Sequence, residues 1–244
     1  NLKKKNKINL KGIIVVNLFG NPFNYEKINK IAKLNNLFLI EDAAQSFGSK
    51  YKNKVSGSLG DVGCFSFYPT KSLSCYGDGG AITTNDKKIY EILKSIRVHG
   101  KSEKNGNFDR IGLTGRLDTI QATVLLEKLK KFRSEQKLRM GIAKIYTNAF
   151  KKNKLIKTQK IEKYSLSTFS VFSIEFNNYK LKNKVISKFK KNKIGYNVYY
   201  KRPMHLEKVF FNLGLKKNSF PKSENLSRNI LSIPIDPYMK KKDI

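Results

Sequence analysis

A strand–helix–strand pattern near the start of the chain constrains the fold more than any other feature. Gly12 to Asn17 is an apolar run typical of a buried strand, and Tyr25 to Asn35 has apolar residues at a helical spacing. A second apolar run, Leu37 to Ile40, is typical of a strand buried on both faces. Two strands joined by a helix at this spacing are expected to be parallel, with a right-handed crossover. The sequence therefore predicts an α/β fold.

Two residues that follow predicted strands suggest chemistry. Asp42 ends the second strand, and open α/β sheets bind ligands at the carboxyl ends of their strands. Lys71 lies beyond a third strand, Val62 to Phe67, where Pro69 forces the chain to turn. Taken alone, Asp42 is more often a turn former or helix cap, and Lys71 a solvated surface residue. Together, an acid that pairs with a pyridinium nitrogen and a lysine that forms a Schiff base are the protein groups of a pyridoxal phosphate site.

The rest of the chain alternates helices and strands, with a change of pattern beyond Lys151 that predicts a small α+β domain. The predicted elements are a hairpin near 51–55, a strand at 81–84, a helix capped by Asp86 that ends near Val98, a loop from His99 to Gly115, a long helix reaching toward Phe150, and strands at 171–176 and 194–199 with a helix between them.

Several segments, in this order, resemble one known family, the DegT/DnrJ/StrS group of pyridoxal-phosphate-dependent sugar-nucleotide aminotransferases. The matching segments are Glu41 to Gly48, Ser56 to Leu73, Tyr76 to Ala81, Arg97 to Gly100, Gly112 to Ala122 and Leu231 to Tyr238. These segments are most similar to those of members that act on UDP-2-acetamido-2-deoxy-3-oxo-hexuronates. Family members carry a further segment before the first residue of this chain and a last helix after Tyr238, so the resemblance predicts a chain shortened at its N-terminus and slightly at its C-terminus.

The resemblance implies a fold and an activity. The fold would be the type I, aspartate-aminotransferase-like fold, with a mostly parallel large domain at residues 1–150 and a small α+β domain at 151–244. The activity would be amino transfer from L-glutamate to a 3-keto or 4-keto sugar nucleotide, through pyridoxamine phosphate, for surface polysaccharide such as lipopolysaccharide. The enzyme would be a cytoplasmic homodimer with active sites shared between subunits.

The resemblance also implies roles for five residues that would hold the cofactor. Lys71 would form the Schiff base with pyridoxal 5'-phosphate and later serve as general acid and base. Asp42 would keep the pyridine nitrogen protonated, and Gln45 would reach the ring hydroxyl. Ser66 would hydrogen-bond the phosphate, and Ala44 would pack on the face of the ring.

Three further residues are expected on the substrate or subunit side. Thr114 stands where the family usually has an asparagine that approaches the phosphate from a neighbouring subunit, and its hydroxyl is a shorter donor. Arg116 would meet an anionic group of the substrate, although a surface arginine is an equally good interpretation. His205 lies in a segment similar to a substrate-side loop, and the alternative is an exposed loop histidine.

The net charge of +32 invites a different interpretation, because 50 Lys and Arg face only 18 Asp and Glu. Such a balance is typical of nucleic-acid-binding proteins. The lysines are nevertheless scattered through every segment, and Asn and Ile, which share A/T-rich codons with Lys, are also abundant. We interpret the charge as composition and expect no nucleic-acid or membrane partner. Cys64 and Cys75 are expected to be free thiols, and no metal-ligand cluster is predicted.

Three functional alternatives stay open at this point. A nucleic-acid-binding module would show salt-dependent binding to DNA. A sugar-nucleotide dehydratase shares the fold, but that branch replaces the lysine with histidine, so Lys71 argues against it. A non-catalytic, regulatory member of the family is compatible with a shortened chain.

Overall fold

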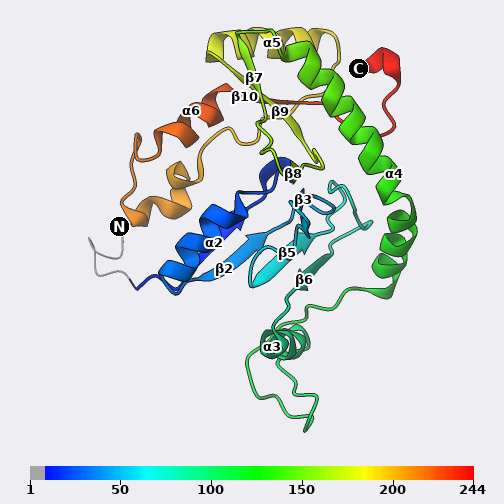
Figure 1. Cartoon of the computed structure of the whole chain (residues 1–244), viewed down its shortest axis with the longest axis vertical. Helices are drawn as coiled ribbons and strands as arrows, with labels where there is room; N and C mark the ends of the chain where they lie inside the picture. Colours follow the sequence, from blue (N-terminus) through cyan, green and yellow to red (C-terminus); the bar gives the residue numbers. More distant parts are fainter. Residues whose placement is uncertain (1–8) are drawn as a thin grey trace. The chain divides into compact units, whose positions relative to one another are not determined.

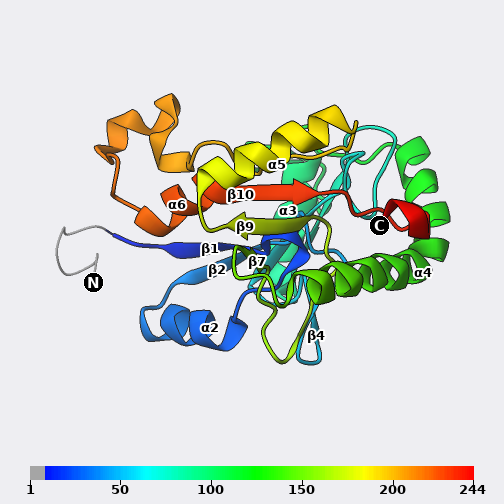
Figure 2. The same cartoon turned by 90° about the horizontal axis from the view of Figure 1, so that it is seen from above.

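The computed structural model describes residues 9–244, and contacts within the chain divide it into two compact units. The first unit comprises the described residues up to Gln136 together with Ile161–Ser170, and the second comprises Lys137–Lys160 and Val171–Ile244. This division falls inside the longest helix, α4 (Thr119–Phe150), which Figures 1 and 2 show in green. The predicted domain boundary at residue 150 stays a prediction.

The first unit is built on the predicted α/β sheet. Its strands are β1 (Gly12–Val16), β2 (Phe38–Asp42), β5 (Val62–Ser66) and β6 (Gly80–Thr83), in the order β1-β2-β5-β6. The pairs β1–β2 and β2–β5 are parallel, and β6 is antiparallel to β5. Helix α2 (Tyr25–Leu34) connects β1 to β2 (Figure 1), which confirms the predicted strand–helix–strand unit.

The expectations that β1 is a buried strand and that β2 is buried on both faces are wrong for one face of the sheet. On one face Leu39 and Glu41 are buried, whereas on the other Ile14 is 67% exposed and Phe38 37% exposed. The register explains this division. Phe38 pairs with Gly12, and because side chains alternate between faces along a strand, Ile14 lies on the same face as Phe38. An apolar run indicates which side chains can be buried. Whether they are buried depends on whether another segment covers them in the folded structure.

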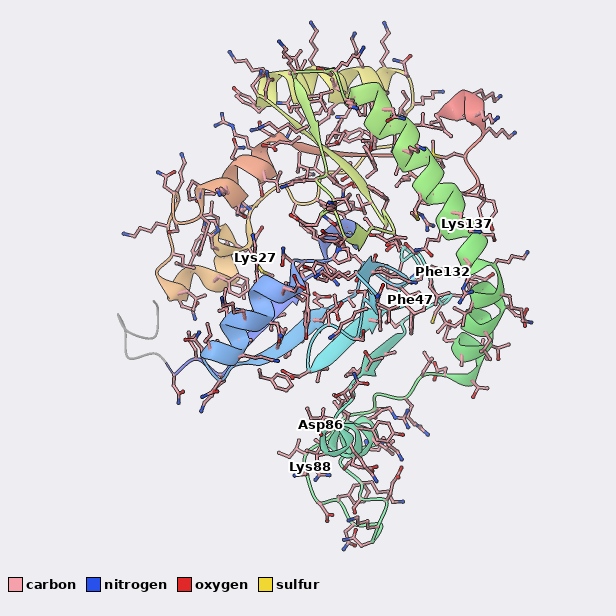
Figure 3. All side chains as sticks on the ribbon, viewed as in Figure 1. Lys27, Phe47, Asp86, Lys88, Phe132 and Lys137 are labelled. Carbon is pink, nitrogen blue, oxygen red and sulfur yellow. The ribbon has the colours of Figure 1, made fainter. Side chains whose placement is uncertain are left out.

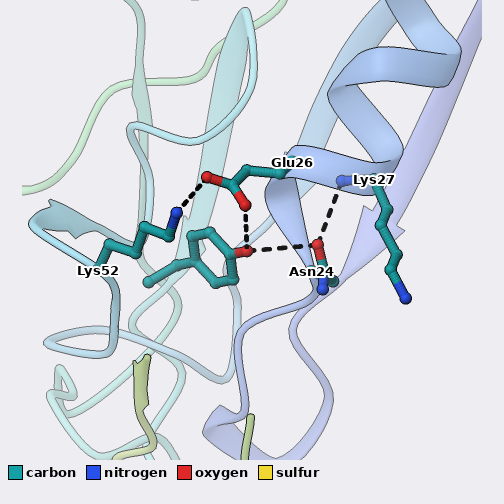
Figure 4. Close-up of polar contacts among 5 residues, drawn as sticks. Asn24, Glu26, Lys27 and Lys52 are labelled. Atoms are coloured by element: carbon teal, nitrogen blue, oxygen red, sulfur yellow. Dashed lines mark hydrogen bonds and ion pairs between the residues drawn. The ribbon is translucent and has the colours of Figure 1, made fainter. Parts of the chain in front are cut away.

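A predicted hairpin packs beside the start of α2. Its strands are β3 (Lys50–Tyr51) and β4 (Lys54–Val55), and β3 also pairs with β8 (Ser165–Leu166). The Tyr51 hydroxyl lies 3.3 Å from Asn24 Oδ1 and 3.4 Å from Glu26 Oε2, and Lys52 pairs with Glu26 (Figure 4). The hydrogen bond from Lys52 lowers the pKa of Glu26, so this contact is lost only as the pH falls through that lowered value. The four side chains tie the hairpin to the N-terminal turn of α2, which the Asn24 side chain caps.

The core of the first unit lies between the sheet and α4. Phe67, Leu73, Cys75 and Phe132 form its buried cluster. Phe47 packs edge-on against Phe132 with ring centroids 5.1 Å apart (Figure 3). Because Leu73 and Cys75 belong to the segment after β5, this core also anchors the loop that carries Lys71.

Helix α3 (Lys87–Arg97) begins at the predicted cap, Asp86, whose carboxylate accepts hydrogen bonds from Lys88 N at 2.7 Å and Ile89 N at 3.0 Å. An Asp86→Ala variant should therefore lose about 1 kcal/mol of unfolding free energy in urea denaturation. Lys88→Ala is the matched control, since Lys88 contributes only its backbone to the cap and its side chain is exposed (Figure 3). Equal stabilities of the two variants would show that the cap contributes nothing.

The second unit is a small α+β arrangement. Strands β7 (Ile156–Thr158), β9 (Phe172–Phe176) and β10 (Ile230–Ile233) form an antiparallel sheet in the order β10-β9-β7, with helices α5 (Tyr179–Lys191) and α6 (Pro221–Asn229). Short 3₁₀ turns of this unit lie at Met204–Leu206, Lys208–Leu213 and Lys241–Asp243, and the first unit has one at Leu18–Gly20.

The predicted strand at 194–199 is wrong. Only Asn197 pairs with the sheet, through an isolated bridge to Ser232 in β10. Alternating side chains are compatible with a strand, but a strand also needs a partner along its length, and β10 offers one for a single residue. Over residues 9–244, no helix is both long and apolar enough to cross a bilayer.

Candidate functional site

The strand register brings two predicted site residues, Asp42 and Ser66, and the thiol of Cys64 onto one face of the sheet. Asp42 in β2 is opposite Cys64 in β5, and Ser66 lies two residues further along β5 on the same face. Both strands are parallel and end here, so the side chains lie at the carboxyl edge where α/β sheets bind ligands. This is the face on which Ile14 and Phe38 are exposed.

Asp42 and Gln45 are held by backbone groups that leave part of each side chain available. Asp42 Oδ1 accepts a hydrogen bond from Ala44 N at 3.0 Å, which closes the turn after β2. Gln45 Oε1 accepts a hydrogen bond from Phe19 N at 2.6 Å. A backbone N–H can only donate, so the Gln45 oxygen must face Phe19 and its amide NH₂ is left to donate elsewhere. Ala44 is half-buried in the same turn.

Lys71 projects from a loop whose two ends are tied together. Phe67 N donates to Gly79 O at 2.7 Å, and Cys75 N donates to Phe67 O at 2.7 Å. Lys71 itself is half-buried, and among residues 9–244 its amine makes no hydrogen bond or ion pair. Backbone hydrogen bonds therefore hold the base of the loop, whereas no described residue pairs with the Lys71 amine.

The Ser66 hydroxyl lies at the start of this loop. Its oxygen accepts a hydrogen bond from Tyr68 N at 3.3 Å, so the hydroxyl hydrogen can still be donated to a ligand. The pairing of β2 with β5 places the Ser66 hydroxyl and the Asp42 carboxylate on the same face of the sheet, and a ligand site shared by the two stays a prediction.

The structure does not connect Thr114 or Arg116 with these residues. Both side chains are exposed, and Thr114 Oγ1 lies 3.5 Å from His99 Nδ1. No contact with Asp42 or Lys71 is present in the described part of the chain. A role for either residue at a subunit interface stays a prediction.

His205 lies in the second unit, and the interpretation of it as an exposed loop residue is wrong. The residue is 7% exposed, and its Nε2 lies 3.0 Å from Glu224 Oε1 in the first turn of α6. Glu224 also accepts the backbone N–H groups of Asn218 and Phe220, and these bonds together with His205 lower its pKa. The contact joins the 204–206 turn to α6. A substrate role for His205 stays a prediction.

Sequence analysis missed two residues directly behind the site. Asn17 and Glu41 are both fully buried, and Asn17 Nδ2 donates to Glu41 Oε1 at 2.7 Å. Two signals were available: Asn17 is a polar residue that ends an apolar run, and Glu41 alternates with Asp42 and so faces the interior.

Residues 2–244 match the DegT/DnrJ/EryC1/StrS aminotransferase family. The chain belongs to this family. Among family members, the UDP-2-acetamido-2-deoxy-3-oxo-D-glucuronate aminotransferase of Pseudomonas aeruginosa is 35% identical over 94% of this chain and 62% of its own length. A protein of Geobacillus stearothermophilus named pleiotropic regulatory protein is 36% identical over 94% of this chain and 61% of its own length.

Solved structures of the family show the same fold. The crystal structure of a DegT/DnrJ/EryC1/StrS aminotransferase from Brucella abortus matches with a TM-score of 0.92 and 40% identity, over 99% of this chain and 64% of that one. The predicted aspartate-aminotransferase-like α/β fold is therefore confirmed. The chain spans 62% and 61% of the length of the two curated relatives described above.

The groups at this edge of the sheet fit the cofactor of the family's aminotransferases. Pyridoxal phosphate needs an acid for its ring nitrogen, a donor for its phenolic oxygen, donors for its phosphate and a lysine amine. Asp42, the Gln45 NH₂, the Ser66 hydroxyl and Lys71 supply one group of each kind. Asp42, Gln45 and Ser66 each make one internal hydrogen bond and keep a further position for the cofactor, and the Lys71 amine has no described partner.

The two thiols should react at very different rates. Burial, followed by the charges of Asp42 and Glu41, raises the pKa of Cys64, and burial raises that of Cys75. A raised pKa lowers the fraction of reactive thiolate at pH 8. Iodoacetamide should therefore alkylate the half-buried Cys64 several-fold more slowly than free cysteine, and the fully buried Cys75 only after unfolding. Peptide mass spectrometry distinguishes the two sites, and labelling of Cys75 in the folded protein would contradict its burial.

Proposed function

We propose that this chain acts as a pyridoxal-phosphate-dependent aminotransferase that moves the amino group of L-glutamate to a keto-sugar nucleotide. The observation that supports the proposal is the set of complementary groups at or just beyond the carboxyl ends of β2 and β5: Asp42, Gln45 and Ser66, with Lys71 in the loop that follows β5. Membership of the aminotransferase family supports it.

The substrate class follows from the relatives rather than from the site. The Pseudomonas relative is named for a UDP-linked 3-oxo-glucuronate, and we extend this to a 3-keto or 4-keto sugar linked to a nucleoside diphosphate. The product would enter surface polysaccharide synthesis, including lipopolysaccharide. The net charge of +32 would attract such a diphosphate. We further propose a cytoplasmic homodimer in which Thr114 and Arg116 contact the cofactor phosphate and the substrate across the interface, with His205 on the substrate side.

Different residues of the chain would transfer protons and stabilise charge during the reaction. When bound, the cofactor supplies a ring that withdraws electrons from the substrate carbon. The Asp42 carboxylate holds a proton on the ring nitrogen, which strengthens that withdrawal. Lys71 Nζ removes the proton from Cα of L-glutamate and later delivers a proton, as general base and then general acid. Ser66 donates to the phosphate, and Ala44 leaves room for the ring.

The test is a titration of the protein with pyridoxal phosphate, followed by absorbance and then by addition of L-glutamate. We expect a protein-bound absorbance band that L-glutamate removes with formation of 2-oxoglutarate, and borohydride reduction that attaches the cofactor to Lys71. Binding should also slow the alkylation of Cys64, which lies beside Asp42. If neither the chain nor a longer polypeptide that contains it binds the cofactor, the aminotransferase proposal fails.

A regulatory role is the second candidate, because one relative at 36% identity is named a pleiotropic regulatory protein. The same titration separates the two. Cofactor binding with Cys64 protection, but without 2-oxoglutarate from L-glutamate, would favour a regulatory protein that retains the site.

A further inference from the structure

The turn between β1 and α2 is strained and buried. Phe19 has φ 60° and ψ 20°, a left-handed conformation that is rare for a bulky side chain, and only 5% of the residue is exposed. Gly20 follows with φ 81°, where an added Cβ would lie 2.4 Å from Thr168 Oγ1. Strained backbone of this kind persists only where the surrounding contacts over-determine it, and it is concentrated at functional sites.

The strained conformation aims the Phe19 N–H at Gln45. Phe19 N donates to Gln45 Oε1 at 2.6 Å, which fixes the orientation of that amide. With its oxygen occupied, Gln45 presents only its NH₂ donors to a ligand. Donors favour an anionic oxygen over a protonated one, because hydrogen bonds to the charged form stabilise that form.

All the polar groups of Asn17, in its backbone and its side chain, form hydrogen bonds in or beside the turn. Its N–H donates to Asp42 O at 3.0 Å, and its carbonyl accepts from Gly20 N at 3.3 Å. Its side-chain oxygen accepts from Phe23 N at 3.0 Å, while Nδ2 donates to Glu41 Oε1 at 2.7 Å. The bonds to Asp42 and Gly20 come from the backbone of Asn17, whereas its side chain ties Phe23, just beyond the turn, to Glu41. Nδ2 also lies 3.1 Å from Ser46 Oγ and 2.9 Å from Ser56 Oγ, so the same side chain reaches the turn that carries Gln45.

Glu41 in turn fixes the orientation of Asn17. Its carboxylate is fully buried and accepts from Ser56 Oγ at 2.7 Å and Leu59 N at 2.9 Å, in addition to Asn17. The Ser56 hydroxyl also contacts Ser46, whose N–H closes the turn that carries Gln45 by donating to Ala43 O at 3.0 Å. A buried carboxylate can only accept, so the nitrogen of Asn17 must face it.

We propose that Asn17 and Glu41 are positioning residues for the cofactor ring. Together they hold the 17–20 turn in its strained form, and the turn orients Gln45 so that it offers only N–H donors to the ring's phenolic oxygen. The proposal rests on the proposed function, since it assigns Gln45 to that oxygen. Neither Asn17 nor Glu41 touches the ligand.

The polarity of the Asn17–Glu41 contact provides a sharp test. Asn17→Asp places a second carboxylate against Glu41 and loses the hydrogen bond. In Asn17→Asp/Glu41→Gln, the new amide donates to the new carboxylate, so the bond returns with its donor and acceptor exchanged and the buried charge is unchanged. Gln45→Ala removes the group that both residues are proposed to orient.

The experiment measures the dissociation constant for pyridoxal phosphate and the pH midpoint of the bound cofactor's absorbance change. Asn17→Asp should weaken binding about tenfold and raise that midpoint, because the phenolic oxygen loses its donors. The exchanged pair should bind within about threefold of the wild type, and adding Asn17→Asp to Gln45→Ala should change the midpoint no further than Gln45→Ala alone.

The outcomes separate this inference from the proposed function. A wild type that binds the cofactor, beside an Asn17→Asp variant with an unchanged midpoint, overturns the inference and leaves the function standing. Full additivity of Asn17→Asp and Gln45→Ala also overturns it, since the effect would not act through Gln45. A wild type without cofactor binding overturns both. If Asn17→Asp alone does not fold, the exchanged pair and Gln45→Ala carry the comparison: failure of the pair to restore the wild-type midpoint overturns the inference.

Discussion

A Lys71→Ala variant should form 2-oxoglutarate from L-glutamate about 10³-fold more slowly than the wild type, because it lacks both the nucleophilic amine and the general base. The loop around it should keep its shape, since the anchoring contacts come from Phe67, Cys75 and Gly79 rather than from the lysine side chain. The measurement is 2-oxoglutarate released by protein loaded with pyridoxal phosphate. Circular dichroism shows that the variant is folded.

Two further variants make the Lys71 result specific. Lys71→Arg keeps a positive charge, but a guanidinium does not lose its proton, so the loss should be as large as in Lys71→Ala. Lys88→Ala removes an exposed lysine from α3 and should retain the wild-type rate. Activity of Lys71→Arg within about tenfold of the wild type would show that the lysine supplies only charge, and would contradict its role in proton transfer.

A Phe172→Ala variant should lose about 3–5 kcal/mol of unfolding free energy, the largest effect on stability that we expect from a single side chain. Phe172 is fully buried in β9, and its ring centroid lies 5.2 Å from that of Tyr146 in α4. Ile233 is its partner across the sheet. Removal of the ring therefore leaves a cavity in the buried interior of this unit, which adds to the lost burial of apolar surface.

The matched control for Phe172 is Phe211→Ala in the same unit. Phe211 is 59% exposed in the 208–213 turn, and its replacement should change the free energy of unfolding by less than about 0.5 kcal/mol. Urea denaturation followed by far-ultraviolet circular dichroism measures both variants. Similar losses for the two would contradict the assignment of Phe172 to the core of the second unit.

Elements with strong local signals could be predicted from the sequence. The helix after Asp86 agrees with its prediction to within a residue, because its cap and its apolar stripe act within one or two turns. The parallel pairing of β1 and β2 follows from the helix between them. Because the carboxyl ends of parallel strands meet at one edge of a sheet, the sequence pattern predicts that Asp42 and Lys71 belong to one site, and this stays a prediction.

Predictions that depended on a distant partner were less secure. The segment 194–199 alternates correctly but pairs with β10 at Asn197 alone. An exposed position was one interpretation of His205, yet Glu224, nineteen residues later, turns it inward. In each case the local sequence indicates which conformation or exposure a segment favours. The folded structure also depends on which hydrogen-bond partners a distant segment provides.

The sequence by itself determined the α/β class, the family, and the identity of the acid, amide, hydroxyl and amine at the proposed site, because these depend on side-chain chemistry and local periodicity. Only the tertiary structure decided which face of the sheet is open, that Glu41 is buried against Asn17, and that Phe19 N fixes the Gln45 amide. The physical reason is that hydrogen bonds of buried polar groups join residues 24 and 26 positions apart, and no local pattern encodes which donor meets which acceptor.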